Sequence, residues 1–144
     1  MFAVKTQKFL LGLNAVLGAA LALTPFVLFP VCADPKPDGT PMFCWYSGIF
    51  ITAMGVVVLI LSLLSLRGKL TAFFAVLSAA AALMSWLVPN RTVSIAGTGW
   101  ACGLCADPTH ACRAVTLPAL GVLVTAVILV SIAVLLWNFV KGRR

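Results

Sequence analysis

The sequence predicts an all-α protein built from four transmembrane helices, and three observations support this fold class. Of the 144 residues, 62% are hydrophobic and only 9% are charged, so too few polar groups are present to cover a soluble core. Four stretches lack Asp, Glu, Lys and Arg, and each reaches the roughly 17–25 residues that a spanning helix needs: residues 9–29, 45–66, 70–88 and 114–140. All five cysteines fall in the two connections that this pattern places on one membrane face.

The charges predict how the helices are oriented. Seven basic residues flank the predicted spans on the side of the chain termini: Lys5, Lys8, Arg67, Lys69, Lys141, Arg143 and Arg144. All three acidic residues lie in the other two connections, residues 30–44 and 89–113, where three basic residues balance them: Asp34, Asp38 and Asp107 against Lys36, Arg91 and Arg113. The positive-inside rule then places both termini in the cytoplasm and both cysteine-containing loops outside. Because the basic residues lie at span ends rather than in one patch, we expect a lipid bilayer as partner and no nucleic acid.

The first span, residues 9–29, begins after two lysines and carries Asn14 as its only strongly polar residue. We expect Asn14 to bond to another helix, and Gly12 and Gly18 to allow a neighbouring helix to approach closely. Pro25 is expected to kink this span. The apolar run continues past any plausible cleavage site, so a span is favoured over a cleaved signal peptide.

The remaining spans are defined by their turns. Only Arg67, Gly68 and Lys69 join the second span to the third, so these two helices are expected to be antiparallel neighbours. Alanines 79–82 predict a tightly packed face on the third span, which Pro89 is expected to end. The glycine-rich connection that follows predicts an irregular cap.

A short repeat predicts an internal duplication. Cys32-Ala33-Asp34-Pro35 recurs as Cys105-Ala106-Asp107-Pro108, and in each half the repeat follows an outgoing span and precedes a second cysteine and a returning span. This order indicates two duplicated helical hairpins, related by an axis along the membrane normal. The alternative is a chance resemblance between apolar segments of similar composition.

The first chemical interpretation of the cysteines is structural. Cys32, Cys44, Cys102, Cys105 and Cys112 all fall outside the predicted spans, and in an oxidising exterior such cysteines are typical of disulfides. The repeat favours the pairs Cys32 with Cys44 and Cys105 with Cys112. The sequence alone leaves the connectivity open.

A second interpretation is redox catalysis. Cys102-Gly103-Leu104-Cys105 is a Cys-x-x-Cys segment, a spacing that can hold a reactive thiol pair. Four spans with one cysteine pair in each outer loop resemble the membrane thiol oxidases of the DsbB and vitamin K epoxide reductase class, which use quinone. That resemblance implies a relay from Cys32 and Cys44 to Cys102 and Cys105.

A third interpretation is metal binding. Cys102, Cys105, His110 and Cys112 supply four ligands of the kind that zinc accepts. Met42 and Cys44 beside His110 and Cys112 would instead offer soft ligands to Cu(I). The redox interpretation requires quinone, and the metal interpretation requires copper or zinc. Apart from these two interpretations, no cofactor is expected.

Several segments together resemble a known family. They are Pro30-Val31-Cys32, Pro41-Met42-x-Cys44-Trp45, Gly103-Leu104-Cys105 with Pro108 and Cys112, and Thr116-x-Pro118-Ala119-Leu120. They are similar to the small four-span prokaryotic membrane proteins grouped as domain of unknown function number 4418. The resemblance implies a place in the prokaryotic cytoplasmic membrane, four recurrent cysteines (Cys32, Cys44, Cys105 and Cys112) with Cys102 as an extra one, and an association with export-type ABC transporters.

The function expected from all of this is a non-enzymatic accessory subunit of a membrane complex, in particular a transporter. The chain contains no Glu, no glycine-rich phosphate loop and no histidine beside a nucleophile, which argues against hydrolase, kinase and nucleotide-binding classes. The predicted spans hold no ionisable carboxylate or amine, so they offer no obvious path for ions or protons.

Overall fold

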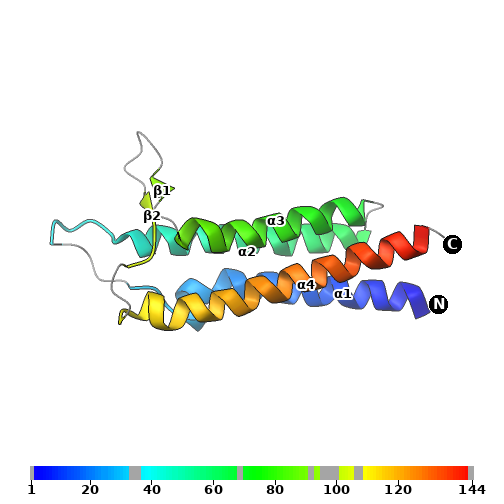
Figure 1. Ribbon diagram of the computed structural model, residues 1–144, viewed down its shortest axis with the longest axis horizontal. Helices are drawn as coiled ribbons and strands as arrows, with labels where there is room; N and C mark the ends of the chain where they lie inside the picture. Colours follow the sequence, from blue (N-terminus) through cyan, green and yellow to red (C-terminus); the bar gives the residue numbers. More distant parts are fainter. Residues whose placement is uncertain are drawn as a thin grey trace.

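The computed structural model describes residues 2–32, 37–67, 70–90, 93–94, 101–105 and 109–142, which form a bundle of four long helices (Figure 1). The helical elements are α1 (Phe2–Leu23), the π-helical turn η1 (Thr24–Leu28), α2 (Phe43–Arg67), α3 (Thr71–Asn90), the π-helical turn η2 (Cys112–Thr116) and α4 (Leu117–Gly142). All four helices are long and apolar enough to cross a membrane. The predicted all-α, four-span fold class is therefore confirmed.

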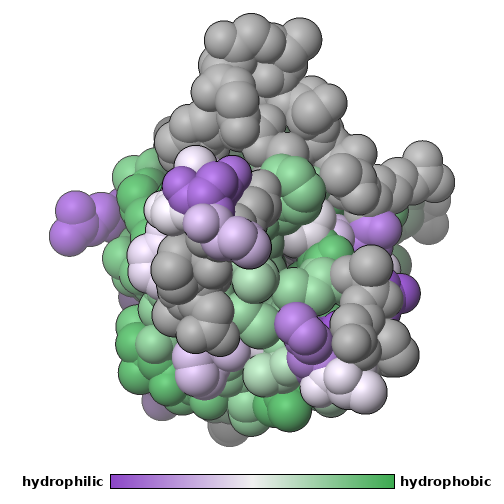
Figure 2. All heavy atoms as spheres, turned by 90° about the vertical axis from the view of Figure 1, so that its left-hand side faces the viewer, coloured by the Kyte–Doolittle hydropathy of each residue, from purple (hydrophilic) through white to green (hydrophobic). Residues whose placement is uncertain are grey.

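Consecutive helices run in opposite directions, and α4 closes the bundle against α1 (Figure 1). The start of α1 and the end of α4 lie together at one end, here called the terminal end. The connections that carry the cysteines lie at the other, here called the cysteine end. Viewed onto the cysteine end, hydrophilic side chains are spread over this face and hydrophobic side chains cover much of its margin (Figure 2).

The second connection at the cysteine end contains two short strands. β1 (Val93–Ser94) pairs antiparallel with β2 (Ala101–Cys102), with Val93 opposite Cys102. An irregular cap was expected here, but pairing two short segments satisfies backbone groups that an irregular chain would leave to water. That expectation rested on Gly97, Gly99, Gly103 and Pro108, of which only Gly103 lies among the described residues.

Besides the apolar residues around Cys44 and Cys112, the described part of the interior contains two apolar clusters. The larger one lies toward the cysteine end and consists of Leu21, Ile51, Val58, Ala81, Ala82, Leu120, Val124 and Val127. The smaller one, toward the terminal end, consists of Leu11, Ala75 and Val134. Four buried polar residues occupy the positions between them along their helices, namely Asn14, Ser62, Ser78 and Ser131. A polar layer therefore separates the two clusters and gives the helices a specific register.

Within this layer the Asn14 side-chain amide donates a hydrogen bond to the Ser62 hydroxyl at 3.0 Å. Ser62 in turn donates to the carbonyl of Val58 at 2.8 Å. The expected bond from Asn14 to another helix is thus present, between α1 and α2. Among the described residues, the Asn14 Oδ1 and the Ser131 Oγ are buried without a hydrogen-bond partner.

Asn14 and Ser62 are expected to be energetically coupled. In a double-mutant cycle of Asn14→Ala, Ser62→Ala and the double variant, unfolding in detergent should give a coupling of about 0.6 kcal/mol and no more than about 1.7 kcal/mol, the average and the maximum found for hydrogen bonds between membrane helices. Additive losses from the two substitutions would show that this bond does not hold α1 to α2.

The helices α1 and α2 approach each other closely at two glycines. A Cβ placed on Gly55 would lie 2.3 Å from the backbone nitrogen of Ala22, and one placed on Gly18 would lie 2.8 Å from that of Leu59. The expectation of close approach is therefore right for Gly18. It is wrong for Gly12, where an added Cβ meets nothing within 4 Å.

The buried face of α3 is made entirely of small residues. They recur at helical spacing as Thr71, Ala75, Ser78, Ala82, Ser85 and Pro89. This is the tightly packed face that the alanine run predicted, although Ala80 within that run is exposed. Pro89 does not end the helix, which continues to Asn90; the Asn90 side-chain amide donates to the carbonyl of Trp86 at 2.8 Å, where regular backbone bonding stops.

Prolines explain the π-helical turns. Pro25 has no N–H to donate and its ring crowds the preceding turn, so the chain widens over η1 and the N–H of Phe29 bonds to the carbonyl of Thr24 at 2.8 Å. The Thr24 hydroxyl donates to the Ala20 carbonyl at 2.7 Å. Pro118 stands two residues after η2 and has the same effect on the start of α4. Both turns lie at the cysteine end: η1 ends shortly before Cys32, and Cys112 is the first residue of η2.

Candidate functional site

Four of the five cysteines meet at the cysteine end. Their Sγ atoms all lie within 4.8 Å of one another, in a group made of Cys32, Cys44, Cys105 and Cys112. The Sγ atoms of Cys32 and Cys112 are 3.8 Å apart. All five cysteines are present as thiols. We call this group the four-thiol cluster.

Each cysteine of the cluster comes from a different element. Cys32 follows η1, Cys44 lies in the first turn of α2, Cys105 follows β2 and Cys112 begins η2. Cys44 and Cys112 are fully buried, whereas Cys32 and Cys105 are half-buried. Each half of the chain therefore supplies one half-buried thiol after an outgoing helix and one buried thiol at the start of a returning helix, in the order that the proposed duplication requires.

Hydrogen bonds that cross between the halves hold this arrangement. The Oγ of Ser47, three residues after Cys44, accepts from the backbone N–H of Gly103 at 2.7 Å. The Thr116 hydroxyl, four residues after Cys112, donates to the carbonyl of Phe29 at 3.0 Å. Each returning helix thus binds the outgoing segment of the other half, just before its cysteine. These bonds between side chains and backbone help to bring the four sulfurs together.

Apolar side chains enclose the cluster. Val31 is buried with Cys44 and Cys112, and the residues packed against these three include Met42, Trp45 and Leu104. Trp45 also makes an edge-to-face contact with Phe26 of η1, with ring centroids 5.0 Å apart. The thiols therefore lie in a weakly polar environment, in which Cys44 and Cys112 are buried and Cys32 and Cys105 are half-buried.

Two nitrogen-containing side chains stand on the open side. The Arg113 Nη1 donates to the carbonyl of Cys105 at 3.3 Å. The His110 Nδ1 lies 4.0 Å from the Sγ of Cys32. Both side chains are exposed, and the guanidinium of Arg113 brings a positive charge to the rim of the cluster.

Burial suppresses ionisation of the loop thiols. Desolvation, opposed by a hydrogen bond from Cys112, raises the pKa of Cys105 to about 11 from a reference of 9.0. Desolvation also raises the pKa of Cys102. Since the thiolate is the nucleophile in disulfide exchange, a protonated Cys105 is a poor exchange partner at neutral pH.

This pKa predicts slow alkylation of Cys105. In the reduced, metal-free protein at pH 8, iodoacetamide should modify Cys105 about 100-fold more slowly than the same residue in denatured protein, because about two pKa units separate the two states. The pKa is raised in the folded state, so the neutral thiol stabilises the fold below pH 9 and this contribution is lost as the pH rises through 11. Peptide mass spectrometry measures both rates, and equal rates would contradict the buried environment.

The cluster differs from the residue sets proposed from spacing. Cys102 is buried on β2 and is not one of the four cysteines in the group, although both the Cys-x-x-Cys and the zinc-type set depended on it. Cys32 takes its place. Met42 packs against the cluster, and His110 lies beside Cys32. The remaining residues of the repeat, Asp34, Pro35, Asp107 and Pro108, lie outside the described residues.

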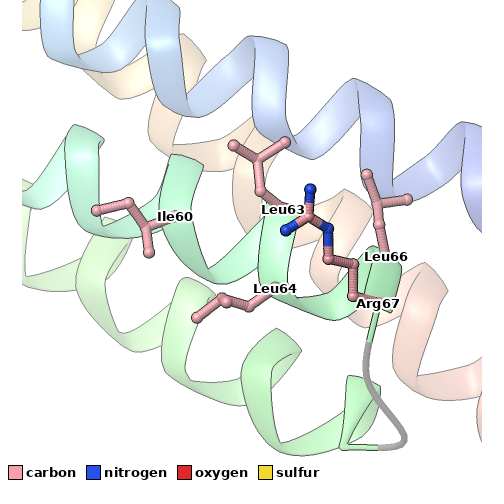
Figure 3. A pocket seen from close by; sticks show the side chains of 5 residues that line it. All are labelled: Ile60, Leu63, Leu64, Leu66 and Arg67. Atoms are coloured by element: carbon pink, nitrogen blue, oxygen red, sulfur yellow. The ribbon is translucent and has the colours of Figure 1, made fainter.

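A separate hollow lies near the terminal end, on the surface of α2. It has a volume of about 350 Å³ and is lined by Ile60, Leu63, Leu64, Leu66 and Arg67 (Figure 3). Its walls are the aliphatic side chains and Arg67 supplies the one polar group. Such a surface matches a lipid acyl chain rather than a polar substrate.

Comparison with known proteins gives one result. A family model described as "Domain of unknown function (DUF4418)" matches residues 14–137, a range that contains all five cysteines, the whole of α2 and α3, and most of α4. No curated protein matches the chain, and no solved structure matches it.

Proposed function

This chain belongs to the DUF4418 family, and on that premise we propose that it is a non-enzymatic subunit of a membrane complex whose outer end is closed by the four-thiol cluster. The molecule itself is a small membrane protein with four helices able to span a bilayer. The proposal assigns the helices to association with other membrane proteins and the cluster to holding the bundle together.

The closed state of the cluster is the observation that supports this proposal most. A thiol oxidoreductase must present a reactive thiolate to its partner. Here two of the four thiols are fully buried, Cys44 and Cys112, and the half-buried Cys105 has its pKa raised to about 11. These properties favour a structural centre over an exchange relay.

The helices also argue against transport by this chain alone. None of the four predicted spans, residues 9–29, 45–66, 70–88 and 114–140, contains Asp, Glu, Lys, Arg or His. Polar side chains within the bundle bond to neighbouring helices: Asn14 bonds to Ser62, and Thr52 bonds to the carbonyl of Ala22. Without a polar path, a role alongside another protein is the better explanation.

The proposal includes an orientation and a partner. By the positive-inside rule, the basic residues at the terminal end support a cytoplasmic location for that end and an outer location for the four-thiol cluster, in the prokaryotic cytoplasmic membrane. The resemblance to family members that accompany export-type ABC transporters makes such a transporter the partner to test first.

Co-purification tests this function. Native membranes are cross-linked, the tagged chain is purified in mild detergent, and partners are quantified against an unrelated four-span protein carrying the same tag. We expect a transporter subunit to be recovered in a molar amount close to that of the tagged chain. Recovery of the chain alone would contradict the proposal, and capture of a soluble thiol carrier through a mixed disulfide would favour the oxidoreductase alternative.

A further inference from the structure

We infer that the four-thiol cluster is a binding site for one zinc ion, with Cys32, Cys44, Cys105 and Cys112 as its four thiolate ligands. This inference goes beyond the proposed subunit role and does not depend on it. It also differs from the zinc-type set expected from spacing, because Cys32 replaces Cys102 and His110 is not a ligand.

The sulfur geometry carries the inference. Zinc binds thiolate at about 2.3 Å in a tetrahedron, so neighbouring sulfurs in such a site are about 3.8 Å apart. The Sγ atoms of Cys32 and Cys112 are 3.8 Å apart, and all four sulfurs lie within 4.8 Å of one another. A group in which every sulfur is near the other three is what a tetrahedral ion requires, whereas two disulfides require only two close pairs.

The donor set selects the metal. Four thiolates in a tetrahedral arrangement favour zinc or iron over harder ions. A site with four protein ligands and no open position is also typical of structural rather than catalytic zinc. The enclosing residues agree with this, since Val31, Met42 and Trp45 leave the buried thiols Cys44 and Cys112 little access to solvent.

The surroundings offset part of the charge. Four thiolates with one zinc ion carry a net charge of about −2, which is costly in a weakly polar pocket. The exposed guanidinium of Arg113 lies at the rim, anchored to the carbonyl of Cys105. Such contacts around the ligands orient them and tune the site.

Zinc in this position would join the two halves of the chain. Its ligands come from the segment after η1, from α2, from the segment after β2 and from η2. The N–H of Leu104 bonds to the carbonyl of Pro89 at 3.1 Å, which links α3 to the ligand Cys105. One ion would thereby fix the outer ends of all four helices.

Elemental analysis tests the site. The full chain is purified from membranes without chelator or added metal, and zinc, iron and copper are measured against protein. We expect zinc near one per chain, with at least a tenfold loss in Cys32→Ser and in Cys44→Ser and no change in the matched control Cys102→Ser. His110→Ala should also keep its zinc. Zinc below about 0.1 per chain, or iron or copper in its place, would overturn the inference.

A spectroscopic measurement on the wild-type protein tests the site even if the cysteine variants do not fold. Wild-type protein is stripped of metal under reductant and titrated with Co²⁺ alone. We expect thiolate-to-cobalt charge-transfer bands and the intense visible bands of tetrahedral cobalt, saturating at one ion per chain and displaced by zinc. Protein that instead contains two disulfides and takes up no cobalt after reduction would refute a four-thiolate site.

Discussion

Gly55→Leu is expected to prevent α1 and α2 from packing, which is the largest effect that a single substitution should have in this bundle. The Cβ alone would lie 2.3 Å from the backbone nitrogen and 2.6 Å from the Cα of Ala22. Backbone atoms cannot rotate out of the way as a side chain can, so the helices must separate. Even Gly55→Ala should cost at least the roughly 1–3 kcal/mol typical of overpacking.

The measurement is thermal unfolding in detergent, together with the fraction of protein that elutes as a single species. Gly12→Ala on α1 is the matched control, since an added Cβ there meets nothing within 4 Å. It should leave the melting temperature unchanged or raise it slightly, because alanine favours the helix over glycine. If Gly55→Ala melted like Gly12→Ala, α1 and α2 would not approach as closely as described.

Removal of zinc should have the second largest effect. A structural zinc ion can contribute roughly 10 kcal/mol or more to the folding of the segment that binds it, and here it would join four otherwise separate segments. Treatment with a strong chelator under reductant should therefore lower the melting temperature by roughly 20–40 °C, since about 1 kcal/mol corresponds to about 2–4 °C in chains of about this size.

The cysteine variants separate this effect from nonspecific actions of the chelator. Cys102→Ser should respond to the chelator as the wild type does. Cys44→Ser should already melt at the lower temperature and should not respond further. A wild-type protein whose melting temperature is insensitive to chelation would show that no metal stabilises the cysteine end.

The sequence was sufficient to predict the helices and insufficient to predict the details of their ends. Long uncharged runs specify spanning helices because lipid demands internal backbone bonding. The π-helical turns at Thr24–Leu28 and Cys112–Thr116 depend on how a proline is accommodated by the turn before it, and a proline predicts only that some distortion occurs. Likewise, glycine content predicts close approach in general, but only the packing shows that Gly18 is used and Gly12 is not.

The ligand set was harder to predict for a similar reason. Cys102 and Cys105 have a familiar spacing, and this local signal favoured a pair that the structure does not place together in the cluster. The contacts that select Cys32 are formed between residues far apart in sequence, such as Thr116 with Phe29 and Ser47 with Gly103. The repeated order of one cysteine after each outgoing helix and one before each returning helix was the signal that pointed to the correct four.

The most direct test of the central claim, that the two halves bring their thiols together in one cluster, is disulfide formation between Cys32 and Cys112 in a variant whose other three cysteines are serine. Since their Sγ atoms are 3.8 Å apart, a mild oxidant should join these two cysteines quickly. A second variant that retains only Cys102 and Cys112 should stay reduced over the same time, and mass spectrometry of digested peptides measures both reactions. The claim would be contradicted if the second variant formed its disulfide rapidly while Cys32 in the first variant remained a free thiol.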